Sequence, residues 1–182
     1  MRIIAGEKRS MAIAAPKGQD TRPTQDYIRE SLFNILRAWL PDARVLDLFA
    51  GSGALGLEAL SRGAAEAVLN DRSADASAVI RQNVTRLGYE EKTTLLRCEW
   101  HAALERLRGR QFDLVFLDPP YRMTETGEMC AAMADMGLLA EGARVVIEHA
   151  KGGVPEPGER FACADARRYG DTEIHFFDFE GA

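Results

Sequence analysis

The stretch that decides the fold runs from Val45 to Gly56, V-L-D-L-F-A-G-S-G-A-L-G. Its first residues are apolar and predict a buried strand, and its glycines predict a tight turn that leads directly into a helix over Ala54–Ser61. A glycine turn of this kind lets backbone N–H groups and a helix N-terminus approach a ligand closely. Asp47 stands at the carboxyl end of the strand, where open α/β sheets bind their ligands. The stretch therefore predicts a ligand site at one edge of a sheet.

Strand patterns and helical patterns alternate on both sides of this stretch. The expected strands cover 44–48, 66–70, 93–97, 112–117 and 143–148, and the expected helices cover 24–40, 53–62, 73–87, 100–107 and 125–137. Such alternation is typical of a mostly parallel sheet with right-handed crossovers. Residues 161–169 and 172–180 differ, because they predict two strands joined around Gly170-Asp171. We therefore expect an α/β fold with an antiparallel hairpin at one edge of the sheet.

The N-terminal segment precedes the alternating region. Residues 2–5 and 9–15 alternate weakly around G-E-K-R and predict a small β-hairpin. Thr24 is the expected N-cap of the first helix, and Pro41 is expected to end that helix. We find no internal repeat and no linker long enough for a second full domain. The sequence thus predicts a hairpin extension over 1–20 and one α/β domain over 21–182.

The composition is that of an ordinary globular protein. The 182 residues are 46% hydrophobic and 28% charged, and no apolar run approaches the roughly 20 residues that a membrane span needs. The first residues lack the apolar centre of a signal peptide, so we expect a cytoplasmic protein. The three cysteines and three histidines are scattered, with no metal-ligand spacing. We therefore expect reduced core thiols and no metal site.

The net charge of −5 is distributed unevenly. Residues 1–18 hold four basic side chains, Lys8 and Arg9 among them, against only Glu7, which gives +3 and leaves −8 on the other 164 residues. A basic arm of this kind would grip phosphate, while the acidic body would be repelled from non-specific nucleic acid. Ordinary surface variation explains the same numbers equally well. Charge alone leaves both interpretations open.

The glycine turn and the next strand indicate a cofactor that carries a ribose. The spacing Gly51-x-Gly53-x-x-Gly56 matches the dinucleotide fingerprint, and Asp71 stands about 20 residues on, where a ribose-binding carboxylate is expected. Both an NAD-like cofactor and S-adenosylmethionine fit this pattern. Asp47 favours the second, because a carboxylate there would repel a pyrophosphate but suits a methionine ammonium group. The alternative is that Asp47 only accepts hydrogen bonds from the turn.

A second signal, Asp118-Pro119-Pro120-Tyr121, follows the apolar strand F-D-L-V-F-L. Two successive prolines remove two N–H donors, which leaves a carboxylate beside bare carbonyl groups. This acceptor-only arrangement suits an exocyclic amine, whose two N–H donors it would satisfy while orienting the nitrogen lone pair toward an electrophilic methyl group. Tyr121 could stack on a base taken out of its helix. The alternative is a structural turn with a capping Asp118.

These residues resemble the class I S-adenosylmethionine-dependent methyltransferases that carry a D-P-P-[YF] motif. Four segments resemble, in order and spacing, the bacterial 16S ribosomal RNA guanine-N2 methyltransferase family. They are R-I-I-A-G at 2–6, R-P-T-Q-D-Y-I-R-E-S-L-F-N at 22–34, D-L-F-A-G-S-G-A-L-G-L-E-A-L-S-R-G at 47–63 and D-P-P-Y at 118–121. The resemblance covers essentially the whole chain, and R-P-T-x-D is much more specific than the glycine turn.

The resemblance implies a Rossmann-like sheet of seven strands, with helices on both faces and a small N-terminal hairpin. It also implies an rRNA-processing enzyme that binds RNA and transfers a methyl group from S-adenosylmethionine to the N2 amine of a guanine in 16S rRNA. By the same resemblance that base is guanine 966, presented within an assembled or assembling small ribosomal subunit. No metal is implied.

Three groups of site residues follow. The expected cofactor-binding residues are Asp47, Phe49, Gly51, Gly53, Asp71, Arg72, Glu99, Trp100 and Asp118. The residues expected to act on the target base are Asp118, Pro119 and Tyr121. The residues expected to contact RNA or border its pocket are Lys8, Arg9, Arg22, Thr24, Asp26 and Arg29. Glu99 near the adenine is equally well explained as a solvated carboxylate at a helix start, and the arginines and Lys8 as ordinary surface residues.

Two departures from the family and three rival functions remain. Ser10 stands where the family commonly has Gly, and Glu99 where a shorter Asp or Asn is usual. One rival is an adenine-N6 DNA methyltransferase, although such enzymes usually carry a larger target-recognition region. Another is an NAD-dependent oxidoreductase, which leaves Asp118-Pro119-Pro120-Tyr121 without a role. The third, a cofactor-binding module without catalysis, is distinguished from all of these by an Asp118→Ala variant.

Overall fold

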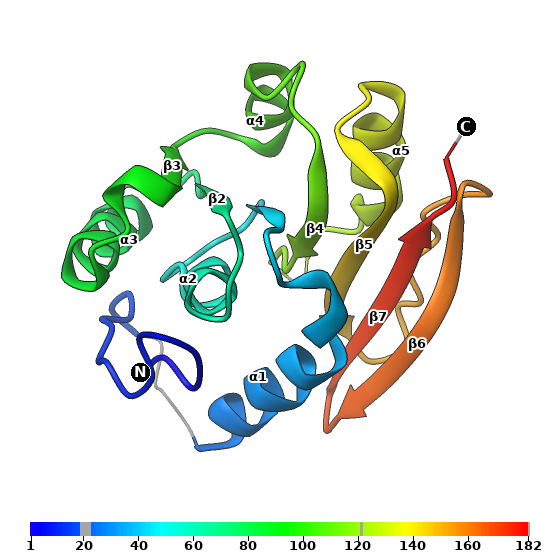
Figure 1. The fold of residues 1–182 in the computed structure, drawn as a ribbon. Coiled ribbons are helices and arrows are strands. Elements are labelled where there is room, and N and C mark those ends of the chain that lie inside the picture. The colour runs from blue at the N-terminus through cyan, green and yellow to red at the C-terminus, as the bar shows by residue number, and fades with distance from the viewer. Residues whose placement is uncertain (19–22, 121, 182) are drawn as a thin grey trace.

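A computed structural model describes residues 1–18, 23–120 and 122–181 (Figure 1). Its strands are β1 (Arg44–Asp47), β2 (Glu66–Asn70), β3 (Thr93–Leu96), β4 (Phe112–Leu117), β5 (Leu139–Ala150), β6 (Phe161–Tyr169) and β7 (Thr172–Phe179). Its α-helices are α1 (Pro23–Ile35), α2 (Ala54–Ser61), α3 (Ala74–Leu87), α4 (Trp100–Arg106) and α5 (Thr126–Asp135). Short 3₁₀ turns lie at Arg37–Trp39 and Glu90–Lys92.

The seven strands form one sheet in the order β3-β2-β1-β4-β5-β7-β6. β1 to β5 are parallel, and β7 pairs antiparallel with both β5 and β6. The predicted Rossmann-like sheet with an antiparallel C-terminal edge is therefore confirmed. The outer strand β6 is mostly exposed, and its register shifts between Cys163 and Asp165.

Helices cover both faces of the sheet, as expected. In Figure 1, α1, α2 and α3 lie on one side of the strands, and α4 and α5 lie on the other. Because successive strand residues point to opposite faces, one core takes Val45, Phe116 and Val146 with α1 to α3. The other core takes Leu46 and Leu117 with α4 and α5. The same alternation decides to which face of the sheet the polar side chains at the ends of these strands point.

The first helix is shorter than the predicted 24–40. α1 begins at Pro23, so Thr24 is its second residue and not its N-cap, and α1 ends at Ile35. A 3₁₀ turn follows, which swings the Trp39 ring over the Arg144 guanidinium of β5 at 3.7 Å. The expectation of one helix as far as Pro41 was wrong, because the packing of Trp39 on the sheet overrides the helical pattern.

The N-terminal segment pairs with itself through few hydrogen bonds. Arg2 and Ala12 form an isolated antiparallel bridge, and the N–H of Ile3 donates to the carbonyl of Met11 at 2.9 Å. Ser10 has a φ of +67°, in the left-handed region that favours glycine, so the turn keeps a conformation suited to Gly although Ser stands there. Ile3 and Ile13 are buried in the core beside α1 to α3. The predicted division at residue 20 falls outside the described residues.

Candidate active site

The turn between β1 and α2 needs its glycines for two different reasons. Gly51 and Gly53 have φ values of +58° and +80°, a region that side chains disfavour. Gly56 has ordinary backbone angles, but a Cβ on it would come within 2.2 Å of a methyl carbon of Leu69 on β2. The first two glycines thus shape the turn, and the third lets α2 pack closely on the sheet.

Asp47 is buried at the end of β1, with 1% of its surface exposed. Its Oδ2 accepts from the backbone N–H of Gly56 at 3.3 Å, whereas its Oδ1 is buried with no hydrogen-bond partner among the described residues. Burial raises the pKa of Asp47 to about 7; the Gly56 hydrogen bond opposes this rise and the charge of Asp71 adds to it. The turn therefore uses one oxygen of this carboxylate and leaves the other available.

Asp71 and Glu99 follow β2 and β3 on the same edge. The Asp71 carboxylate accepts from the backbone N–H of Gly51 at 3.0 Å and of Ser73 at 2.9 Å, which ties the two loops together. Glu99 is exposed at the start of α4 and forms an ion pair with Arg72 at 3.2 Å. Sequence reasoning missed Asn70 at the end of β2. Its buried side-chain amide donates to the backbone carbonyls of Leu48 and Cys98, both at 3.1 Å, and so ties together the ends of three strands.

Asp118 directly follows β4, and Glu148 lies near the end of the neighbouring parallel strand β5. Leu117 on β4 pairs with Ile147 on β5, so Asp118 and Glu148 lie side by side in the register. Burial raises the pKa of both carboxyl groups, and the charges of Glu148 and Asp47 raise that of Asp118 further. Within the described parts of the chain, no hydrogen-bond donor reaches either carboxylate. Sequence reasoning missed Glu148, since no motif marks it.

A cavity of about 550 Å³ joins these groups at the carboxyl edge of the sheet. Of its described lining residues, five are carboxylates and two, Arg29 and Arg72, are guanidinium groups. A second cavity of about 790 Å³ lies beside it, and Pro119, Pro120, Met123 and Glu148 line both. The strongly acidic lining favours a cationic ligand and disfavours a pyrophosphate.

The structure gathers most of the predicted site residues around this cavity. Those that line it are Asp47, Phe49, Gly51, Asp71, Arg72, Glu99, Trp100, Asp118, Pro119 and Arg29. Gly53 supports the turn without lining the cavity. Lys8 and Arg9 lie elsewhere, because the N–H of Lys8 bonds to Ser61 at the far end of α2. Arg22, Tyr121 and the side chain of Thr24 lie outside the described residues.

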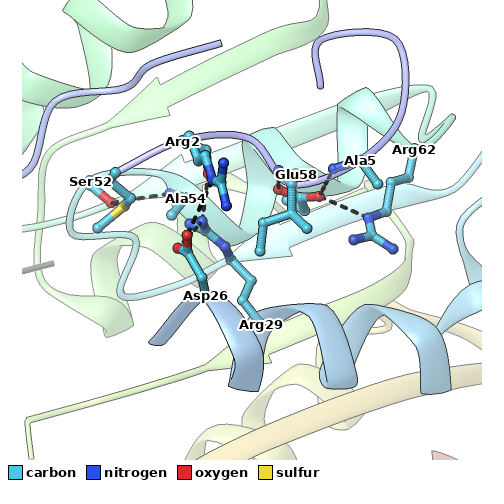
Figure 2. Close-up of polar contacts among 10 residues, drawn as sticks. Arg2, Ala5, Asp26, Arg29, Ser52, Ala54, Glu58 and Arg62 are labelled. Carbon is cyan, nitrogen blue, oxygen red and sulfur yellow. Dashed lines mark hydrogen bonds and ion pairs between the residues drawn. The ribbon is translucent and has the colours of Figure 1, made fainter. Parts of the chain in front are cut away.

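Polar contacts hold α1 and the N-terminal segment against the glycine turn (Figure 2). The buried Arg29 donates to the backbone carbonyl of Arg2 at 2.5 Å and to Asp26 at 3.1 Å, and Arg2 also pairs with Asp26 at 3.4 Å. Ser52 in the turn donates to the Met1 sulfur at 3.5 Å. Asp26 therefore acts here within the protein, through these two arginines, and not as a cavity-lining group.

The histidines and cysteines differ from what we expected, which was scattered histidines and cysteines buried in the core. His149 and His175 share a hydrogen bond of 2.7 Å between Nε2 and Nδ1, with Glu173 nearby. That N–N distance is shorter than the roughly 3.3 Å that separates two nitrogen ligands of a tetrahedral zinc ion, so the two rings share a hydrogen bond. All three cysteines are free thiols, but Cys163 is exposed and was wrongly expected in the core.

The parallel sheet, the glycine turn and the acid-lined cavity define a class I, Rossmann-like methyltransferase. A family model described as conserved hypothetical protein 95 matches residues 1–178, and the chain belongs to that family. It is 39% identical over 150 residues to ribosomal RNA small subunit methyltransferase D of Escherichia coli, covering 81% of this chain and 74% of that protein.

Two further relatives match along the whole chain. The YlbH protein of Bacillus subtilis is 33% identical over 186 residues, covering 100% of both chains. The solved structure of yhhF from Escherichia coli has a TM-score of 0.88 and 32% identity, covering 100% of this chain and 99% of that one. Among the described residues, no helix is long and apolar enough to cross a membrane.

Proposed function

We propose that this protein transfers a methyl group from S-adenosylmethionine to the exocyclic N2 amine of a guanine in 16S rRNA. One observation carries the proposal: a buried carboxylate with a free oxygen, Asp47, lies in the same cavity as the acceptor-only group formed by Asp118 and Pro119. The first suits a cationic donor, and the second suits an amine that has hydrogens to give.

The residues around the glycine turn fit S-adenosylmethionine. The free Oδ1 of Asp47 would accept from the methionine ammonium group, which would compensate the cost of burying this charge. Asp71 has lone pairs left for ribose hydroxyls beyond its two backbone contacts, and Glu99, which also lines the cavity, would accept from the adenine amino group. When bound, the cofactor supplies a methyl group already activated by a sulfonium.

The chain's own task is then to hold the amine. The Asp118 carboxylate and the Pro119 carbonyl would each accept one N2–H, which turns the nitrogen lone pair toward the methyl group. In the overall reaction a carbon–nitrogen bond forms, the carbon–sulfur bond breaks, and one N2 proton leaves. A carboxyl group whose pKa is raised, as burial raises that of Asp118, is suited to accept this proton. Stacking of Tyr121 on the base stays a prediction.

The RNA target is supported by the relatives. The Escherichia coli relative is named for methylation of the small ribosomal subunit RNA, and it aligns with 81% of this chain. We extend this to 16S rRNA held in an assembled or assembling small subunit in the cytoplasm, with guanine N2 as the acceptor. The charge of the protein agrees with a structured partner, since a net charge of −5 disfavours non-specific RNA coating.

The test is transfer of labelled methyl groups to small subunits, to free 16S RNA and to DNA, followed by mapping of the modified base. We expect label on one guanine of 16S RNA, with subunits the better substrate. Label in DNA alone would support the adenine-N6 alternative and overturn the RNA assignment. Saturable binding of NAD but not of S-adenosylmethionine in calorimetry would support the oxidoreductase instead.

A further inference from the structure

Glu148 stands where the two cavities meet. It lies near the end of β5, and its side chain lies on the α1 to α3 face of the sheet, because Val146 two residues earlier is buried in that core. It lines both the cavity of Asp47 and the neighbouring cavity beyond Pro119 and Pro120. Glu148 is therefore within reach of a ligand that extends from Asp118 into the second cavity.

The basic side chains that line the two cavities do not neutralise the charge of Glu148. Arg29 and Arg72 line the first cavity, but each already pairs with a carboxylate, Asp26 and Glu99 respectively. Lys151 and His149 line the second cavity, and His149 is hydrogen-bonded to Ala150 and His175. Among the described residues, none of these groups forms an ion pair with Glu148. Two adjacent carboxylates without a protein donor suit a ligand that brings several N–H groups on one edge.

The edge of guanine has that property. Its N1–H and its N2 amine are neighbouring donors, whereas adenine places the unprotonated N1 acceptor beside its amine. A carboxylate facing N1 therefore attracts guanine and repels the lone pair of adenine. A site built around a buried acceptor strongly rejects an analogue that lacks the matching N–H.

We propose that Glu148 is a specificity-determining residue that accepts a hydrogen bond from guanine N1–H while Asp118 accepts from the N2 amine. This inference rests on the proposed function and assigns to the same site a residue that recognises the base. It also distinguishes two roles: Asp118 holds the nitrogen that reacts, and Glu148 checks the atom next to it.

The test compares guanine with 2-aminopurine at the methylated position of the RNA, at pH 8.5. The analogue keeps the N2 amine but has an acceptor at N1. For the wild-type protein we expect kcat/KM to fall at least about 100-fold with 2-aminopurine. For Glu148→Gln, whose amide both donates and accepts, we expect this preference to shrink at least about tenfold, the effect of one charge-assisted hydrogen bond.

The matched control is Glu173→Gln on β7. Glu173 points to the other face of the sheet, since Ile174 beside it is buried in the core of α1 to α3, and it lines neither cavity. This control should keep the wild-type preference, and both variants should bind S-adenosylmethionine with wild-type affinity in calorimetry.

Two results would overturn the inference while leaving the proposed function intact. One is methylation of 2-aminopurine by the wild-type protein as fast as guanine, which needs no variant. The other is an unchanged guanine preference in a folded Glu148→Gln protein. A wild-type protein that methylates DNA and no RNA would instead overturn the proposed function, and the inference with it.

Discussion

Burial disfavours the ionised form of the Asp47 carboxyl group in the free protein. Its carboxyl is almost fully buried, keeps one oxygen without a partner, and has a pKa raised to about 7 by that burial. An ammonium group would favour the ionised form, so cofactor binding should drive a proton off Asp47 when the pH is near or below 7. The residue thus links cofactor affinity to pH.

We predict that the Kd for S-adenosylmethionine rises as the pH falls from 8.5 to 6. Below its raised pKa the free Asp47 is protonated, and its proton must leave before the ammonium group can pair. Calorimetry in buffers of different ionisation enthalpy should show proton release at pH 6.5 and little at pH 8.5. In Asp47→Asn the affinity should be weak, and this pH dependence should disappear. A flat pH profile in the wild-type protein would contradict the role given to Asp47.

The same residue makes a prediction about the stability of the free protein. The pKa of Asp47 is higher in the folded protein than in the unfolded chain. Between about pH 4 and pH 7 the folded state therefore holds more protons than the unfolded state, and the protein loses stability as the pH rises. Asp47→Asn should therefore raise the free energy of unfolding at pH 8, by at most about 4 kcal/mol, and change it little at pH 4. Urea titrations at the two pH values measure the difference.

Asp118→Ala tests the reacting carboxylate separately from cofactor binding. Loss of a group that positions the amine should reduce kcat by about 100-fold or more, with the Kd for S-adenosylmethionine nearly unchanged. Asp113→Ala is the matched control, because Asp113 lies near the start of the same strand, at its other end, and pairs with Arg44. Full activity in Asp118→Ala would indicate that the D-P-P-Y segment is only a structural turn.

At this scale the sequence predicted the residues that carry a motif and missed those that only the sheet brings into place. Asp47 and Asp118 stand at the ends of apolar strands next to a glycine turn and a proline pair, and Asp71 stands at the fingerprint spacing from that turn, so their shared edge was predictable. Glu148 ends the equally apolar predicted strand 143–148 but has no such signal. Its position beside Asp118 depends on the β4–β5 register, which the chain sets through long-range packing.

Among the elements, α2 does more than lead away from the glycine turn. Its Glu58 is fully buried and accepts from the backbone N–H groups of Ile4 and Ala5, both at 2.9 Å, and from Arg62 at 2.9 Å (Figure 2). One carboxylate therefore fastens the N-terminal segment to the helix that carries the turn.

We predict that Glu58→Gln destabilises the protein by roughly 2–4 kcal/mol, because it leaves buried donors short of an acceptor and Arg62 without its counter-charge. Urea unfolding followed by far-UV circular dichroism measures this loss. Glu105→Gln removes an exposed ion pair between Glu105 on α4 and Arg108, which follows the helix, and should leave the urea midpoint unchanged. Equal midpoints for Glu58→Gln and the wild-type protein would show that the N-terminal segment does not depend on this carboxylate.

The elements themselves were largely predictable from periodicity. The strands at Glu66–Asn70, Phe112–Leu117 and Phe161–Tyr169 begin and end where their patterns do. β5 is longer than the predicted 143–148, because Leu139 also pairs with β4 across an irregularity in the register. Such an extension depends on the neighbouring strand, and no local pattern reports it.

For the whole molecule, the sheet couples two cores that share the same strands. The strands place alternate residues in the core of α1 to α3 and in the core of α4 and α5. Unfolding of either helical layer would therefore expose apolar side chains of the sheet to water. Two tryptophans report on these layers: Trp39 lies over Arg144 on one face, and Trp100 is buried on α4 at the other.

We predict one cooperative unfolding transition. In the single-tryptophan variants Trp39→Phe and Trp100→Phe, the fluorescence midpoint in urea should coincide with the far-UV circular dichroism midpoint of the same variant. Comparing the two signals within each variant removes any effect of the substitution on stability. A fluorescence transition that precedes the circular dichroism transition in either variant would reveal a layer that unfolds alone.

The outer strand β6 has a further consequence for how copies of the molecule meet. A free strand edge can template pairing with another chain, which leads to aggregation. On β6 the register shift between Cys163 and Asp165 interrupts the regular ladder, and the guanidinium groups of Arg167 and Arg168 stand along the exposed margin. A neighbouring molecule therefore meets a kinked, charged border on that side, which opposes growth of the sheet into fibres at high concentration.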